Sequence, residues 1–260
     1  MSASQRPRAA PELSGVTEGR SAAPGDIVGR LRAGELTLEG RLVNASNASF
    51  YGHVGGAGPD EAPLACVYKP VRGERPLGDF PDGTLAAREV AAYELSEAIG
   101  WAIVPPTVLR EGPFGPGMVQ AWLEPDPEID PVDLIRGSAD ALRRMALFDA
   151  VANNADRKVG HLLPMADGHV YGVDHGICFA VDPKLRTVLW NWRGERFHAA
   201  ERRVLAALEP ALSGTLGQRL GELLAPDEVD ATRARVAGLR RAGRFPQPDP
   251  YRPAVPWPPY

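Results

Sequence analysis

The chain has 260 residues and a formal net charge of −4, with 44% apolar and 24% charged residues. This composition fits a globular protein large enough for two lobes, and the acidic balance argues against a nucleic-acid binder, which usually carries a basic surplus. Two cysteines are too few for a disulfide scaffold. No apolar run is long enough for a signal peptide or a membrane span, so we expect a cytoplasmic protein without a transmembrane segment.

The two ends of the chain differ in composition from its middle. The first residues are rich in Ala, Ser, Pro and Arg without periodicity, which is typical of disorder. The last residues are proline-dense, and their Trp257 and Tyr260 are candidates for docking on the body. A further proline-rich stretch, 125–133, indicates a lobe boundary. We therefore expect four segments: a disordered arm at 1–25, an N-terminal lobe at 26–124, a C-terminal lobe at 125–245 and a proline-rich tail at 246–260.

The first half of the chain is mainly strand-like. Alternating apolar residues predict a hairpin from 35–44 and 49–55, and a third strand follows over 63–71 with Lys69 near its end. Apolar residues at helical spacing predict a helix over 85–99, which Gly100 ends. Two more strands are expected after it, at 104–112 and 117–125.

The second half is mainly helical. A helix is predicted over 139–152, and a dense polar cluster follows it. Two short strands are expected within 160–180, with Ala166, Asp167 and Gly168 as their turn. Three C-terminal helices are then expected, at 199–212, 216–224 and 227–241.

Two motifs in this half point to a family. The segment NNADRKVGHLLP, 153–164, is followed by VYGVDHGICFA, 170–180. This pair resembles the phosphatidylinositol 3-/4-kinase-like superfamily, which has an Asp-Arg-x-x-x-Asn loop and then an Ile-Asp-x-Gly hairpin. The similarity is greatest to the type II phosphatidylinositol 4-kinase branch and its bacterial relatives, including uncharacterised actinobacterial proteins, and spans roughly 36–180. It implies an α+β, two-lobed protein-kinase-like fold with an N-terminal antiparallel sheet plus helix and a mainly helical C-terminal lobe.

The resemblance also implies roles for individual residues. Asp156 stands where the family has its catalytic base, and Asp174 where it has a metal-binding carboxylate. Lys69 would hold the nucleotide phosphates, with a helix glutamate as its partner, for which we choose Glu89 over two later glutamates. Lys158 would neutralise charge on the transferring phosphate. Only three lysines occur in the chain, and two of them fall at these positions.

The nucleotide contacts are predicted from weaker signals. The small residues of the hairpin turn, including Ser46, Asn47 and Ser49, would let backbone N–H groups approach the phosphates. The strand around Gln120 to Trp122 would supply the hinge that pairs with adenine. Small polar turns are common in proteins, so the turn has little weight by itself.

His161 departs from the family pattern, which has a metal-binding Asn at this place. Imidazole prefers ions softer than Mg²⁺. Either the second metal is absent, or the ion is softer than Mg²⁺ with His161 as its ligand, or Asn153 or Asn154 substitutes. A buried structural histidine is an equal alternative.

The segment 182–198 combines two tryptophans, Trp190 and Trp192, with several basic residues. It either contacts an anionic or aromatic acceptor, or packs its tryptophans on the C-terminal helices while the cations stay solvated.

Together these features predict an ATP- and Mg²⁺- (or Mn²⁺-) dependent phosphotransferase whose acceptor is a small-molecule or protein hydroxyl. The alternative is a catalytically impaired pseudokinase, a nucleotide-binding module that acts through protein partners. Transfer of AMP in place of phosphate stays open, since the same electrostatic groups serve both reactions.

Overall fold

The computed structural model describes residues 24–43, 47–56 and 62–260. The expected disordered arm therefore lies almost entirely outside the described residues. The helices are α1 Pro24–Ala33, α2 Leu85–Ile99, α3 Pro131–Arg136, α4 Asp140–Ala152, α5 Ala199–Ser213, α6 Thr215–Gly221 and α7 Pro226–Ala242. The strands are β1 Leu36–Arg41, β2 Phe50–Val54, β3 Leu64–Pro70, β4 Thr107–Gly112, β5 Gly115–Ala121, β6 Leu162–Pro164 and β7 Val170–Gly172.

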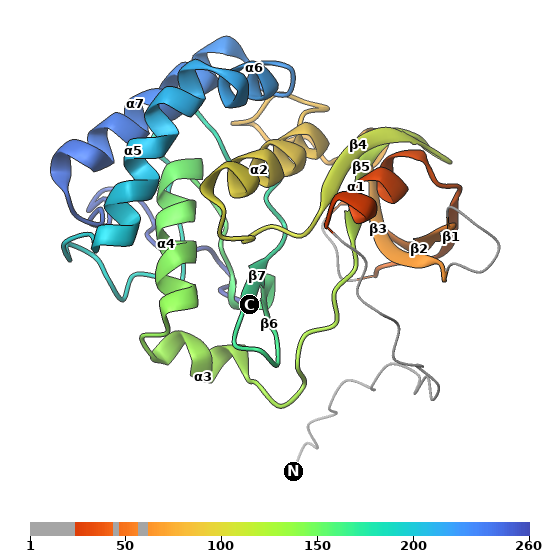
Figure 1. Ribbon diagram of the computed structural model, residues 1–260, viewed down its shortest axis with the longest axis horizontal. Coiled ribbons are helices and arrows are strands. Elements are labelled where there is room, and N and C mark those ends of the chain that lie inside the picture. Colours follow the sequence, from red (N-terminus) through yellow and green to blue (C-terminus); the bar gives the residue numbers. More distant parts are fainter. Residues whose placement is uncertain (1–23, 44–46, 57–61) are drawn as a thin grey trace.

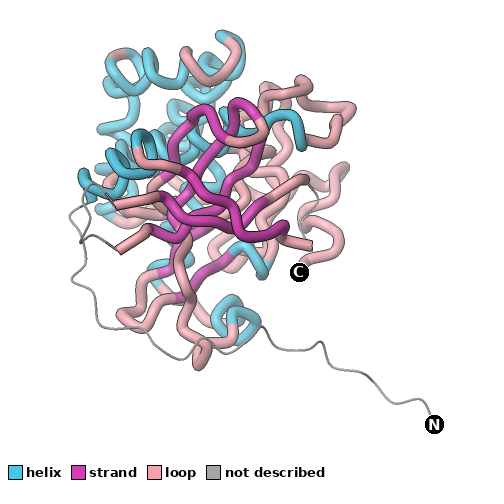
Figure 2. Tube along the Cα trace, turned by 90° about the vertical axis from the view of Figure 1, so that its right-hand side faces the viewer, coloured by secondary structure: helices cyan, strands magenta, loops and turns pink. Residues whose placement is uncertain are grey.

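Five strands form one antiparallel sheet in the order β1-β2-β3-β5-β4, and β6 and β7 form a separate hairpin. The sheet lies at one end of the molecule, and the helices α4 to α7 make up most of the other end (Figure 1). Seen after a quarter turn, the strands cross in front of the helices (Figure 2). This arrangement confirms the predicted fold class, an N-terminal antiparallel sheet followed by a helical region.

Strand β3 holds the centre of the sheet and positions Lys69. Its side chains alternate, so Cys66 and Tyr68 are fully buried in the small core of the sheet while Lys69 faces the opposite side. Lys69 pairs with Met118 of β5 in the ladder. The next β5 residue toward the N-terminus, Gly117, packs directly on β3, where a Cβ atom would lie 2.6 Å from the carbonyl oxygen of Lys69.

Helix α2 connects the sheet to the helical region. It contacts β4 and β5 on one side and α4, α5 and α6 on the other, so apolar residues are needed all round it. Gly100 ends it in the left-handed conformation, with φ 73°, as the sequence predicts. The buried guanidinium of Arg88 donates to Glu228 of α7 at 2.5 Å and to the carbonyl of Cys178 at 2.8 Å.

Three details differ from the sequence-based expectations. Helix α1, whose Leu31 is fully buried, was not expected, because its short length and glycines hide the apolar face. Residues 173–180 form a loop and not a strand, with φ of 63° at Asp174. The tail does dock on the body, but through backbone carbonyls such as that of Ala254, whereas Trp257 is 89% exposed.

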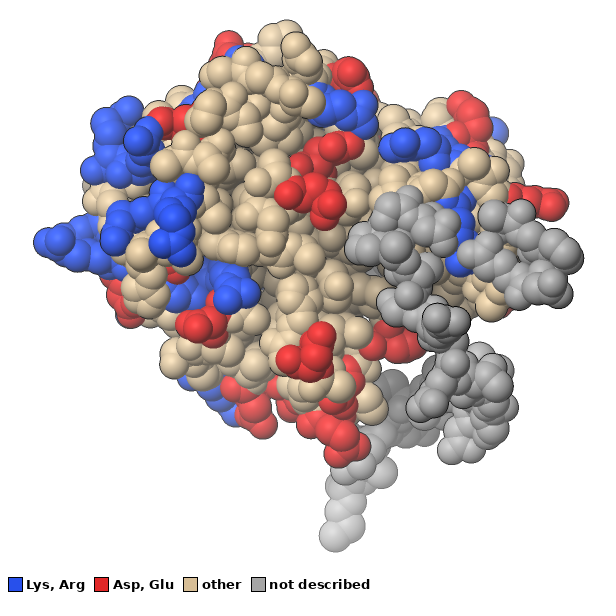
Figure 3. All heavy atoms as spheres, in the orientation of Figure 1, with Lys and Arg blue, Asp and Glu red and all other residues tan. Residues whose placement is uncertain are grey.

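Charged side chains are unevenly distributed on the surface. In Figure 3, lysine and arginine side chains gather at the left-hand end of the molecule, the end at which α7 finishes in Figure 1. In the described part of the chain, no helix combines the length and the apolar character that a membrane span requires.

Gly117→Ala should destabilise the protein by about 1–3 kcal/mol, because the added methyl group collides with backbone of β3. We also expect weaker nucleotide binding, since the collision involves the carbonyl of Lys69. The measurements are urea unfolding and nucleotide titration. The matched control is Gly40→Ala in β1, where a Cβ atom meets nothing within 4 Å; equal losses in both variants would contradict the prediction.

Candidate functional site

Two adjoining cavities lie between the sheet and the helical region. One, of about 420 Å³, is lined mainly by β3, β5 and residues 160–163. The other, of about 360 Å³, is lined by residues 74–77, the start of α2 and Asp156. Both cavities share Asn47, Lys69 and Asp174, so these side chains lie on the wall between them.

Lys69 makes two ion pairs that join the sheet to the rest of the site. Its Nζ lies 2.7 Å from Oε1 of Glu89 and 2.8 Å from Oδ1 of Asp174. Burial acts to lower the pKa of Lys69, but the two carboxylates outweigh it and raise the pKa above its ordinary value. Glu89 is nearly fully buried, and its second oxygen accepts the backbone N–H of His175 at 2.8 Å. Glu94, the next glutamate of the helix, pairs instead with Arg219.

Asp174 and His161 lie side by side. Nε2 of His161 is 3.4 Å from Oδ2 of Asp174, and the charge of Lys69 holds the pKa of this aspartate well below its usual range. Burial lowers the pKa of His161 to about 4, so the ring is neutral near pH 7. Its Nδ1 accepts the backbone N–H of Lys158 at 3.4 Å, which assigns the ring proton to Nε2. In this tautomer Nε2 of His161 faces Asp174 with its proton and carries no lone pair for a metal ion, so a role of His161 as metal ligand stays a prediction.

Asp156 lies at the cavity with Lys158 beside it. The Lys158 ammonium is 3.2 Å from Oδ2 of Asp156. Burial raises the pKa of Asp156, and the hydrogen bond and charge of Lys158 partly oppose the rise. A carboxylate with a raised pKa accepts a proton more readily, which suits a general base.

The residue that fixes this loop, Asp149 of α4, is not among the residues that the sequence motifs predict. Its carboxylate is fully buried. It accepts hydrogen bonds from Nη2 of Arg157 at 2.9 Å, from Nδ2 of Asn154 at 2.9 Å and from the hydroxyl of Thr187 at 3.2 Å. Arg157 in turn donates to the carbonyl of Val173 at 3.1 Å, directly before Asp174. The available signal was a lone carboxylate within the apolar run of residues 145–152, since buried charges require partners.

The two asparagines considered as metal ligands have other partners. The amide of Asn153 donates to the carbonyls of Ala180 and Asp182 and accepts the N–H of Lys184. The side-chain Oδ1 of Asn154 accepts a hydrogen bond from the backbone N–H of Asp156 at 2.9 Å. Both side chains therefore stabilise loop backbone. Among the described residues, no group of three or more His, Cys, Asp or Glu side chains is arranged to hold a metal ion.

The predicted nucleotide contacts are only partly assembled. Ser46 lies outside the described residues, and Ser49 is buried, with its hydroxyl donating to the carbonyl of Asn47 at 3.4 Å. Gln120 and Trp122 line the larger cavity. The side chain of Gln120 donates to a neighbouring threonine, and the backbone N–H of Trp122 donates to the carbonyl of Ala65. That N–H is therefore already paired, while the predicted contact of this backbone stretch with adenine stays a prediction.

Comparison with curated proteins identifies the family. Protein Rv2133c of Mycobacterium tuberculosis (strain ATCC 25618 / H37Rv) is 42% identical over 263 residues, spanning 88% of this chain and 93% of that protein. The chain belongs to the family of Rv2133c. No family model matches the sequence.

Solved structures show which fold the Rv2133c family has. The Golgi casein kinase superposes with a TM-score of 0.57 at 14% identity, over 84% of this chain and 74% of that chain. Hydra Fam20, solved with sugar, superposes with a TM-score of 0.56 at 13% identity, over 83% of this chain and 86% of that chain. The Helicobacter pylori proinflammatory kinase CtkA superposes with a TM-score of 0.50 at 10% identity, over 83% of this chain and 94% of that chain. The fold is therefore kinase-like, and the narrower phosphatidylinositol 3-/4-kinase-like assignment stays a prediction.

Asp149→Ala should destabilise the protein by about 3–5 kcal/mol, because it leaves the buried Arg157 guanidinium without a counter-ion. Urea unfolding measures the loss. The control is Asp133→Ala, which removes a carboxylate from an exposed ion pair with Arg136 and should change stability little. A small effect of Asp149→Ala would show that the loop is held by other contacts.

Stability should fall as the pH is lowered from about 6.5 to about 4. The folded protein keeps His161 neutral in this range, whereas the unfolded chain binds the proton, so protonation favours unfolding by an amount of the order of 3 kcal/mol. His161→Asn should flatten this slope in urea unfolding measured without added metal. The control His198→Asn, at the exposed N-cap of α5, should keep the wild-type slope. An unchanged slope in His161→Asn would contradict the burial argument.

Proposed function

We propose that this protein is an ATP- and divalent-metal-dependent phosphotransferase. The observation that supports it best is Lys69, which reaches from the sheet to both Glu89 and Asp174 on the wall between two cavities. Groups with perturbed pKa values cluster at functional sites, and here the pKa of Lys69 is raised and that of Asp174 is lowered beside a cavity. The Golgi casein kinase, which has a similar fold, has been solved with Mn/ADP bound, and this supports nucleotide and metal use here.

The larger cavity suits the base of the nucleotide. Because the N–H of Trp122 is used within the sheet, the adenine contact moves to the backbone of Leu123, which lines the same cavity. The phosphates would then extend toward Lys69, whose flexible ammonium binds oxyanions as a point charge.

The residues fit a metal that arrives with the nucleotide. Mg²⁺ in such sites is held by one or two carboxylates plus substrate phosphates, so Asp174 would serve with few further protein ligands. When bound, the metal would offset the charge on the phosphate oxygens. His161 keeps Asp174 oriented for this task through the contact from its Nε2.

Asp156 and Lys158 would act on the acceptor side. The acceptor hydroxyl forms the new bond to the γ-phosphorus, and its proton passes to the Asp156 carboxylate. The bond between the γ-phosphorus and the bridging oxygen breaks, and ADP leaves with that electron pair. Lys158, 3.2 Å from Asp156, would offset the negative charge of the group in transfer. The acceptor is a small-molecule or protein hydroxyl, and a phosphatidylinositol 3-/4-kinase-like subtype is part of this proposal.

A second candidate function is a nucleotide-binding pseudokinase that acts through partners. It is favoured by one specific observation, the buried and neutral His161 at the place where the resembling family has a metal-binding asparagine. A protein of this kind would bind nucleotide in the same cavity but would transfer nothing.

Asp174→Asn and Asp156→Asn should each lower ADP formation by about 100-fold or more, because each removes a charged group needed in the transition state. The assay measures ADP release with Mg²⁺ or Mn²⁺. The matched control is Asp167→Asn, in the turn of the β6–β7 hairpin, which should keep wild-type turnover.

Three results would separate the proposals. Nucleotide binding without turnover in the wild type would favour the pseudokinase, and no nucleotide binding would contradict both functions. Mass spectrometry of a modified product distinguishes transfer of phosphate from transfer of AMP.

A further inference from the structure

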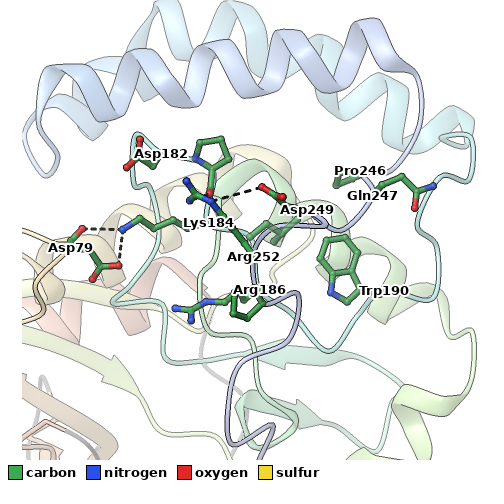
Figure 4. Close-up of a pocket in the computed structure, with 12 residues that line it drawn as sticks. Asp79, Asp182, Lys184, Arg186, Trp190, Pro246, Gln247, Asp249 and Arg252 are labelled. Carbon is green, nitrogen blue, oxygen red and sulfur yellow. Dashed lines mark hydrogen bonds and ion pairs between the residues drawn. The ribbon is translucent and has the colours of Figure 1, made fainter.

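A third cavity, of about 430 Å³, shares no lining residue with the two cavities described above and plays no part in the function proposed above. It is lined by residues 182–186, by Trp190 and by the tail between Pro246 and Pro253, with Asp79 at its rim (Figure 4). We call it the tail pocket. Its volume lies within the range of small-molecule sites.

The tail is fixed against this pocket and is part of its wall. The carbonyl of Ala254 accepts the backbone N–H of Thr187 at 3.1 Å and the indole N–H of Trp190 at 2.8 Å. Arg252 donates to the carbonyl of Pro183 at 2.6 Å. Farther along, the carbonyl of Pro259 accepts the N–H of Val159 at 2.9 Å, so the tail reaches the loop that carries Asp156.

Backbone pairing brings Arg186 beside Asp156. Residues 186–188 run parallel to 154–157, with Arg157 opposite Thr187. The side chains of Arg157 and Thr187 both point inward to Asp149. Side chains alternate along extended backbone, so Asp156 and Arg186, each one residue earlier, share the opposite face.

Among the described residues, Arg186 is the cation of the tail pocket that makes no ion pair within 4 Å, although its charge acts to lower the pKa of the nearby Asp79 and Asp156 carboxyls. Lys184 is paired with Asp79 at 2.6 Å, and Nε of Arg252 lies 3.8 Å from Asp249. Figure 4 shows the Arg186 guanidinium below the Lys184–Asp79 pair and on the same side as Asp79, with Trp190 at the other end of the pocket. A planar guanidinium binds carboxylate and phosphate oxygens in a bidentate manner.

We propose that the tail pocket binds the anionic group of the acceptor, with Arg186 as its main contact. This inference rests on the proposed function. The acceptor is then a small hydroxyl compound that carries a carboxylate or phosphate group. Arg186 holds that group, Trp190 provides an apolar wall, and the hydroxyl to be phosphorylated lies toward Asp156.

The test uses the full-length, ¹⁵N-labelled protein without nucleotide and follows NMR signals during titration with inorganic phosphate or acetate at constant ionic strength. We expect saturable shifts of the Arg186 Nε–H signal, of the Trp190 indole signal and of the backbone amides at 156–158, with one common binding curve. The two anions show whether phosphate or carboxylate is preferred. Glycerol, which has hydroxyls but no charge, should shift the Arg186 signal at most weakly.

Variants at one position decide whether the site is the predicted one. Arg186→Gln should weaken binding by about tenfold or more, and Arg186→Lys, which keeps the charge but not the planar fork, should retain part of it. The control Arg203→Gln removes an exposed arginine of α5 outside the pocket and should bind as the wild type does.

Failure of this inference can be told from failure of the proposed function. Three outcomes would overturn the acceptor pocket without affecting a measured ATP turnover. They are the absence of saturable NMR shifts, a binding curve of Arg186→Gln equal to that of the wild type, and an absence of shifts at the backbone amides of 156–158. Phosphate binding in a protein that consumes no ATP would overturn the acceptor role together with the proposed function.

Discussion

The rest of the site depends on the ion pair and hydrogen bonds that the buried carboxylate of Asp149 makes. Through Arg157 it fixes the carbonyl of Val173, and thus the position from which Asp174 reaches Lys69. Through Thr187 it holds the segment that places Arg186 beside the loop that carries Asp156. A fully buried ion pair costs desolvation, which its several hydrogen bonds offset, so its value lies in a defined loop geometry more than in net stability.

The charged site is assembled from three structural elements. The sheet supplies Lys69, α2 supplies Glu89, and the loop after β7 supplies Asp174. One lysine faces two carboxylates, so the ionised triad carries a net negative charge, which in the proposed function a divalent cation would offset. The neutral ring of His161 adds orientation without adding charge.

The sequence was sufficient for features that depend on local patterns. Alternation in β3, helical spacing in α2 and the left-handed Gly100 depend on neighbouring residues, and all three are observed. Contacts between residues far apart in the chain could not be predicted from local sequence patterns. Asp149 is one polar residue in an apolar helix, and no local pattern links it to Thr187. The loop at 173–180 was mistaken for a strand because its apolar residues are buried by tertiary contacts, whereas the positive φ of Asp174 breaks the strand geometry.

The attachment of α2 limits how this protein can be regulated. Arg88, next to Glu89 in sequence, is buried in an ion pair with Glu228, and Glu94 one turn later is paired with Arg219. A movement of α2 away from Lys69 would also have to separate the buried Arg88–Glu228 pair and the Glu94–Arg219 pair. Separating buried charges is costly unless water reaches both partners. The position of Glu89 beside Lys69 is therefore coupled to the ion pairs that join α2 to α6 and α7.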